Sequence, residues 1–199
     1  MTYFFIALIL AYLCGSLSSA ILVCRWMHLP DPRSQGSNNP GATNVLRIGG
    51  KKAAIFTLIG DTLKGFLPVI IAHYFNFSGT ELTLIACSAF LGHLCPIFFR
   101  FEGGKGVATG FGSLAALAWP IGFILIACWI SVALIFRYSS LAALITAIVA
   151  PFCVGYFLNP TAGVIIAVMS ALLFYRHKNN IKKLWRGEES KIGSKNKIL

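Results

Sequence analysis

Long uncharged stretches constrain this chain more than any other feature. Between residues 107 and 136 it contains no Lys, Arg, Asp or Glu. An α-helix needs about 20 apolar residues to cross the hydrocarbon core of a bilayer. Only 12% of all residues are charged, whereas about 25% is usual for a soluble domain. The chain is therefore predicted to be an all-α, polytopic integral membrane protein.

About seven transmembrane helices are predicted, each bounded by charge, glycine or proline. Trp119-Pro120 predicts a turn inside the longest uncharged run, and Asn159-Pro160 predicts another turn. The predicted spans are residues 3–24, 53–77 and 82–99, two within 107–136, then 139–158 and 161–175. Without an internal repeat or a long linker, residues 1–199 are expected to form a single domain.

The distribution of Lys and Arg predicts the orientation, because short cytoplasmic loops are rich in these residues. The connections near residues 76–81, 119–120 and 159–160 contain neither. We therefore expect the N-terminus outside and the C-terminus in the cytoplasm. The net charge of +11 fits anionic lipid or small anionic substrates better than nucleic acid, because the basic residues form no separate domain.

Residues 31–47, called the polar loop from here on, are dense in Ser, Thr, Asn and Gly between Arg33 and Arg47. Hydroxyls and carboxamides are neutral donors, Arg offers a planar fork for phosphate, and Gly lets backbone N–H groups approach a ligand. An ordinary surface loop is the alternative interpretation. The concentration of donors between two arginines favours binding of a polyanion.

Residues 101–106, called the glycine loop from here on, lead directly into the apolar span that begins at Val107. Glycines before a helix N-terminus leave N–H groups available to an anion, and Lys105 would neutralise a phosphate. The GxxxxGK[ST] pattern of a nucleotide-binding loop is absent, and a flexible turn is the alternative. The six cysteines include no CxxC pair, so no metal is expected.

The basic tail after residue 175 could continue the last span as a helix, with His177 and Asn180 or Ile181 on one side. His177 could serve as a base or donate a hydrogen bond to a phosphate. Alternatively, the segment could only anchor the protein. Asp61 and Lys64 are three residues apart within a span, so an internal ion pair is favoured over catalysis. His93 is expected on the approach to the glycine loop.

These segments resemble one family, the bacterial acyl-phosphate-dependent glycerol-3-phosphate acyltransferases. The shared motifs are GSNNPGATNVLR at residues 36–47, Gly92-His93 with Pro96, FEGGKGVAT at residues 101–109, and His177 with Asn180-Ile181 and Glu189. They occur in the family's order within a similar seven-span layout and cover nearly the whole chain. Three positions depart from the family. Asn38 stands where Gly or Lys is more common, Lys178 where Arg is usual, and Asn179 where an acidic residue is common.

The resemblance implies transfer of a fatty acyl group from acyl phosphate to the primary hydroxyl of glycerol 3-phosphate, without cofactor or metal. It implies catalytic roles for His177, Ser37, Lys105 and Asn180. It implies substrate-binding roles for Asn39, Thr43, Asn44, Arg47, His93, Gly103, Gly104 and Gly106. Acyl phosphate, glycerol 3-phosphate and membrane lipid are the expected partners of a monomer in the bacterial inner membrane, with the active site on its cytoplasmic face.

Two other classes of protein compete with this hypothesis. A transporter of a phosphorylated solute would explain several spans and the buried charges of Asp61 and Lys64. Transporters commonly have repeated halves and polar groups at the midplane, whereas here the polar segments are predicted at one membrane face. A non-catalytic lipid-binding protein is the third hypothesis, and inert substitutions in all three polar segments would support it.

Overall fold

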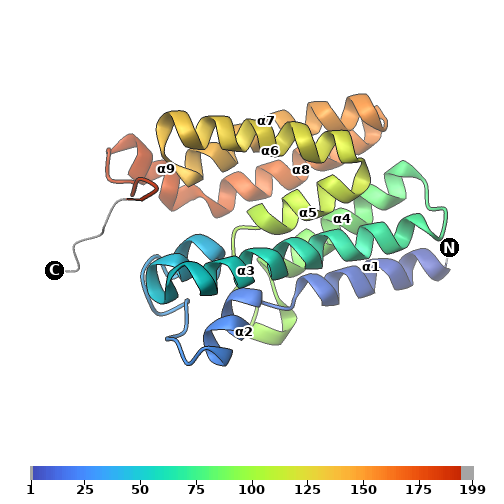
Figure 1. Ribbon diagram of the computed structural model, residues 1–199. Helices are drawn as coiled ribbons and strands as arrows, with labels where there is room; N and C mark the ends of the chain where they lie inside the picture. Colours follow the sequence, from blue (N-terminus) through green and yellow to red (C-terminus); the bar gives the residue numbers. More distant parts are fainter. Residues whose placement is uncertain (1, 194–199) are drawn as a thin grey trace. The chain divides into compact units, whose positions relative to one another are not determined.

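The computed structural model describes residues 2–193, and every regular element among them is a helix (Figure 1). This confirms the predicted all-α class. The helices are α1 (Thr2–Gly15), α2 (Ser19–Trp26), α3 (Ala42–His73), α4 (Gly79–Leu94), η1 (Ile97–Phe99), α5 (Val107–Leu117), α6 (Trp119–Phe136), α7 (Ser139–Phe157), α8 (Pro160–Arg176) and α9 (Lys178–Trp185).

Four helical segments of the described chain are individually long and apolar enough to cross a membrane. They are Ala42–His73, Gly79–Phe99, Trp119–Phe136 and Ser139–Phe157. The bent pairs α1–α2 and α8–α9 raise the number to 6 if each pair is one span. A count of seven would also require α5, which has only 11 residues, so that count stays a prediction.

Both predicted turns are confirmed. Helix α5 ends at Leu117 and α6 begins at Trp119. Helix α8 begins at Pro160, and the side-chain oxygen of Asn159 accepts a hydrogen bond from the N–H of Ala162 at 2.8 Å. Asn is a favoured N-cap because it satisfies an N–H that has no partner inside the helix, and Pro at the first position has no N–H to satisfy.

The first predicted span, residues 3–24, is wrong as a continuous helix, because α1 and α2 meet at an angle of 40°. The hydroxyl of Ser16 donates to the carbonyl of Tyr12 at 2.8 Å, a contact that bends helices. The carbonyl of Leu17, exposed by the break, accepts a hydrogen bond from Lys64 Nζ at 2.8 Å. The side chain of a distant helix therefore satisfies the broken backbone.

The tail also departs from a continuous helix. Helices α8 and α9 meet at 61°, and His177 lies at their junction. The N–H of His177 still bonds the carbonyls of Leu173 and Phe174 at the end of α8, and the next helix begins at Lys178. His177 and Asn180 therefore occupy a corner of the chain and the first turn of a new helix.

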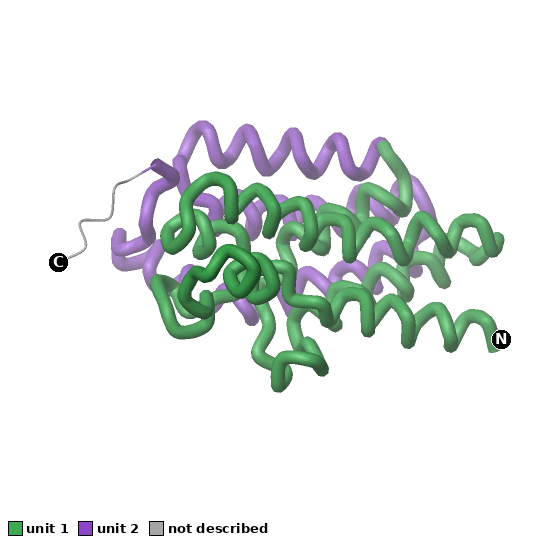
Figure 2. The backbone as a smooth tube through the Cα atoms, turned by 60° about the horizontal axis from the view of Figure 1, so that its bottom comes forward, with its two compact units in different colours: residues 1–119 green, residues 120–199 purple. Residues whose placement is uncertain are grey.

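The chain divides into two compact units, Met1–Trp119 and Pro120–Leu199, coloured separately in Figure 2. The single domain expected for residues 1–199 therefore stays a prediction. In the first unit α3 packs against α1, α2, α4 and α5. Gly65 and Gly112 mark the close contact of α3 with α5, because a side chain at either would collide with the backbone of the other helix.

In the second unit, α7 packs along α8. A Cβ atom at Gly163 would lie 2.9 Å from the Cα of Gly155, so the two backbones approach closely at these glycines. Small residues at helix contacts are typical of membrane proteins, where van der Waals packing replaces the hydrophobic driving force.

Candidate active site

The polar loop is organised by one buried side chain, that of Asn44 in the first turn of α3. Its Nδ2 donates to the carbonyls of Pro32 and Gln35, each at 2.9 Å, while its Oδ1 accepts from the N–H of Ser37 at 2.9 Å. These bonds use both N–H groups of the carboxamide. Asn44 therefore acts by holding the loop in shape.

Several predicted ligands of the polar loop lie on its accessible side. Ser37 is exposed and Asn39 is half-buried. The loop is shorter than predicted because α3 begins at Ala42, so the exposed Thr43 and Arg47 lie in the first two turns of that helix. Gly36 has a φ of +61°, and a side chain there would collide with Asn44 Oδ1. The glycine is therefore required both by the backbone conformation and by the space beside Asn44.

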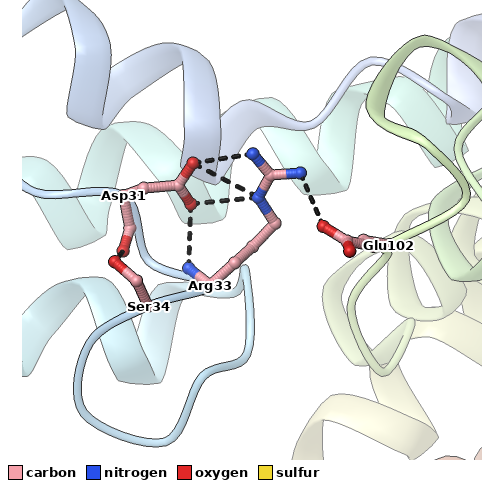
Figure 3. Close-up of polar contacts among 4 residues, drawn as sticks. All are labelled: Asp31, Arg33, Ser34 and Glu102. Carbon is pink, nitrogen blue, oxygen red and sulfur yellow. Dashed lines mark hydrogen bonds and ion pairs between the residues drawn. The ribbon is translucent and has the colours of Figure 1, made fainter.

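A clasp of three charged residues, Asp31, Arg33 and Glu102, joins the polar loop to the glycine loop (Figure 3). The guanidinium of Arg33 donates to the Asp31 carboxylate at 2.7 and 3.0 Å and to Glu102 Oε2 at 2.9 Å. The hydrogen bond from Arg33 holds the pKa of Asp31 below its usual value. The clasp was not predicted from the sequence, although the opposite charges on two loops expected at one membrane face were a signal for it.

The glycine loop lies against the end of α4. The N–H of Gly104 donates to the carbonyl of His93 at 3.1 Å. A side chain at Gly103 would collide with the carbonyls of His93 and Leu94, and one at Gly104 would collide with the ring of His93. The same position at Gly104 is 3.0 Å from the carbonyl oxygen of Pro40, so the glycine loop also abuts the polar loop.

All three glycines predicted to bind phosphate, Gly103, Gly104 and Gly106, are buried, and two of them have structural roles. Gly104 already donates its N–H to His93. Gly106, with a φ of +85°, is the N-cap of α5 and lies against Phe90. Lys105, half-buried between them, immediately precedes this helix N-terminus.

The predicted ion pair between Asp61 and Lys64 is confirmed, with Lys64 Nζ 2.9 Å from Asp61 Oδ1. Both side chains are buried. His93 Nδ1 lies 3.7 Å from the same carboxylate oxygen. The first unit therefore contains a buried cluster of one acidic and two basic side chains next to the glycine loop.

The remaining predicted residues belong to the second unit. His177 is buried, and its Nδ1 lies 2.8 Å from the carbonyl oxygen of Leu173. A carbonyl only accepts, so Nδ1 carries the proton, and in a neutral ring Nε2 is the basic nitrogen. This is the tautomer that a general base needs when Nε2 faces the substrate.

Asn180 is held by a carboxylate on the segment after α9. Its Nδ2 donates to Glu189 Oε1 at 2.7 Å, and the hydroxyl of Ser140 donates to the same oxygen at 2.7 Å. Glu189 was predicted only as part of a family motif, and Ser140 was not predicted. The position of Glu189 in the third motif indicated a functional role for this residue. No local pattern in the sequence distinguishes Ser140.

The apolar helices place this chain in the class of multi-pass membrane proteins. The family model described as glycerol-3-phosphate acyltransferase matches residues 5–187, and the chain belongs to that family. This confirms the resemblance and favours an acyltransferase over a transporter.

Curated relatives named glycerol-3-phosphate acyltransferase agree with this assignment. The protein of Proteus mirabilis is 54% identical over 188 residues, which cover 94% of this chain and 86% of the relative. That of Methylococcus capsulatus is 53% identical over 186 residues, covering 93% and 94%.

The fold is similar to crystal structures of PlsY, described as an integral membrane glycerol 3-phosphate acyltransferase. The glycerol 3-phosphate form matches with a TM-score of 0.90 at 36% identity and 96% coverage of both chains. The form with lysophosphatidic acid matches with a TM-score of 0.87 at 35% identity. These matches support the multi-pass membrane architecture.

Proposed function

We propose that this enzyme transfers a fatty acyl group from acyl phosphate to the 1-hydroxyl of glycerol 3-phosphate, releasing lysophosphatidic acid and inorganic phosphate. Family membership supports the acceptor and the reaction type. The observation that carries the proposal is the contact between two loops rich in phosphate-binding groups, the polar loop and the glycine loop. Two such loops suit a reaction in which both substrates carry a phosphate group.

The chemistry of the donor explains why no covalent enzyme intermediate is needed. Acyl phosphate is a mixed anhydride, so the hydroxyl oxygen of glycerol 3-phosphate attacks an already activated carbonyl carbon. The bond from that carbon to the phosphate oxygen breaks, phosphate leaves with the electron pair, and the hydroxyl proton passes to the proposed base, His177, or to a substrate phosphate. The protein has mainly to hold two substrates in contact, an effect that can lower a barrier by about 7–11 kcal/mol.

The glycine loop is the proposed site of the donor's phosphate. Gly103 and Gly106 are proposed to bring backbone close to this phosphate, while Gly104 shapes the loop because its N–H donates to His93. Gly106 is the N-cap of α5, whose N-terminus carries partial positive charge. Lys105 and Arg47 are proposed to hold the phosphate of glycerol 3-phosphate. Arg47 is exposed and Lys105 is half-buried, and both are cations that can bind a small anion.

The remaining roles belong to hydroxyl, carboxamide and imidazole groups. Ser37, Asn39 and Thr43 are proposed to order the acceptor beside the polar loop, which Asn44 shapes. His177 is the proposed base or stabiliser of developing charge, because its Nδ1 proton is bound by Leu173. Asn180, held by Glu189, is proposed to bind the acceptor.

We further propose that the enzyme is a monomer in the bacterial inner membrane, with these groups on the cytoplasmic face. The bacterial sources of its relatives support the membrane assignment. The concentration of Lys and Arg in the polar segments supports the orientation. Only donor and acceptor are required, and membrane lipid surrounds the apolar helices.

The test mixes purified protein in detergent with acyl phosphate and glycerol 3-phosphate, without ATP. Inorganic phosphate and lysophosphatidic acid should appear in equal amounts. A parallel reaction with acyl-CoA should give no product. Product formation from acyl-CoA, or phosphate release without lysophosphatidic acid, would contradict the proposed donor or acceptor.

A further inference from the structure

His93 lies between a buried pair of charges and the glycine loop. Its Nδ1 is 3.7 Å from Asp61 Oδ1, and Lys64 Nζ is 2.9 Å from the same oxygen. The three side chains are only 6%, 3% and 5% exposed. A histidine this deeply buried is poorly placed to meet a soluble substrate, so its effect on the reaction must pass through its neighbours.

The neighbour on the other side of the ring is Gly104. A side chain at Gly104 would collide with Nε2 and Cε1 of His93. The backbone of His93 contacts the same segment, because its carbonyl accepts the N–H of Gly104 at 3.1 Å and lies against Gly103. His93 therefore supports the glycine loop with its main chain and with its ring.

The charge pair that faces the ring is itself fixed in place. Lys64 Nζ also donates to the carbonyl of Leu17 at the break between α1 and α2, and the adjacent Gly65 packs directly on the backbone of α5. Moving one member of a buried ion pair away from the other is costly. Asp61 is therefore a rigid reference point for the ring.

We propose that Asp61 orients the ring of His93, and that His93 in turn sets the position of the Gly103-Gly104 backbone for catalysis. His93 is then a positioning residue and not a direct ligand of either substrate, which deepens the binding role predicted for it. The Asp61 carboxylate favours a proton on Nδ1, and this directs the Nε2 edge to Gly104. The inference rests on the proposed role of the glycine loop in binding the donor.

A double-mutant cycle tests the contact between the ring and the loop. Gly104→Ala adds a methyl group where the ring of His93 lies, and is expected to lower kcat/KM for acyl phosphate by about 100-fold through displacement of the loop. His93→Ala removes the ring and keeps the backbone carbonyl. In that background Gly104→Ala should cost about 10-fold or less, a coupling of at least ~1.4 kcal/mol.

Gly103→Ala is the matched control. Its methyl group would meet the backbone carbonyls of His93 and Leu94, which His93→Ala leaves in place. The cost of Gly103→Ala should therefore be the same in both backgrounds. If His93→Ala instead reduced the loss of kcat/KM equally for Gly103→Ala and Gly104→Ala, the result would show that His93→Ala merely loosens the region. It would overturn the proposal.

Melting temperatures of the same variants in one detergent give a second readout that requires no activity. The decrease in melting temperature caused by Gly104→Ala should depend on whether His93 is present, whereas the decrease caused by Gly103→Ala should add to that of His93→Ala. This result supports the positioning contact. Additive losses at both positions overturn it. Coupled decreases in melting temperature for Gly104→Ala and His93→Ala, together with an unchanged KM for acyl phosphate in His93→Ala, would support the packing contact. They would overturn the donor role proposed for the glycine loop.

The part played by Asp61 has its own spectroscopic test. Nitrogen-15 NMR of imidazole-labelled protein, with the His93 signals assigned from His93→Asn, should show the proton on Nδ1. Asp61→Asn should alter the proportion of the two tautomers. An Nε2-protonated ring in the unsubstituted protein, or a tautomer ratio unchanged by Asp61→Asn, would contradict orientation by Asp61.

Discussion

Arg33 and Glu102 join two loops that are far apart in the sequence, with 2.9 Å between the guanidinium nitrogen and the carboxylate oxygen. Arg33 at the same time binds Asp31 of its own loop. The arginine therefore links the polar loop to the glycine loop, and both loops contain proposed substrate ligands. The relationship gives the first prediction.

Arg33→Ala is expected to lower kcat/KM more than Glu102→Gln, because only the arginine substitution also removes the bonds to Asp31. The Glu102 carboxylate is 63% exposed, and such exposed pairs contribute at most about 1 kcal/mol. Glu102→Gln should therefore cost no more than about 5-fold. Initial rates at low and high salt measure this, and a larger loss in Glu102→Gln would indicate a direct role in catalysis.

The Asp31 carboxylate predicts a pH dependence of stability. Its pKa in the folded protein is lowered, mainly by the hydrogen bond from Arg33. Such a group stabilises the fold above its unfolded pKa, and this contribution is lost as the pH falls through the lowered folded pKa. The difference in melting temperature between the protein and Asp31→Asn should be constant near neutral pH and shrink in acid. A difference that grows in acid would contradict the assignment.

Asn44→Ala should destabilise the polar loop, because it removes both donors and the acceptor that bind the backbone around Ser37. The bond to the Pro32 carbonyl is buried, and leaving a buried backbone group without a partner costs about 1–3 kcal/mol. Thermal unfolding should show a clear decrease for Asn44→Ala, and little change for Thr43→Ala, the exposed neighbour. Equal melting temperatures of the two variants would remove Asn44 from the support of this loop.

His177→Ala is expected to lower kcat by about 10²–10⁴-fold, the usual contribution of a general base. His177→Asn is the companion variant, because its carboxamide N–H can still donate to the carbonyl of Leu173. A similar loss in both variants, with normal melting temperatures, identifies the chemistry of the ring as the cause. A near-normal kcat in either would leave a substrate phosphate as the proton acceptor.

Glu189→Ala should raise the KM for glycerol 3-phosphate more than it lowers kcat, because it releases the side chain of Asn180 from its bond at 2.7 Å. Ser140→Ala is the matched control, since it removes the other hydrogen bond to the same oxygen and leaves Asn180 held. Steady-state kinetics with glycerol 3-phosphate varied compare the two. Equal effects would mean that Glu189 acts through its general surroundings and not through Asn180.

Local patterns in the sequence determined the helical class, both turns and the Asp61–Lys64 pair. Hydropathy predicts spans because a backbone in lipid must satisfy its own hydrogen bonds. Asn159-Pro160 predicts a helix start because capping and the missing proline N–H act within one turn. The spacing of Asp61 and Lys64 predicts their contact because residues three apart share a helix face. The family motifs are equally local.

The tertiary structure alone decided the relationships between distant segments. The break after Gly15 is stabilised by Lys64 from α3, the N–H of Gly104 is taken by His93 from α4, and Glu189 meets Ser140. None of these pairs lies within one helical turn, so the helical spacing of residues in the sequence does not predict them. Hydrogen bonds and steric exclusion act over a few ångströms in space, and only the packing of whole helices brings such residues within that range.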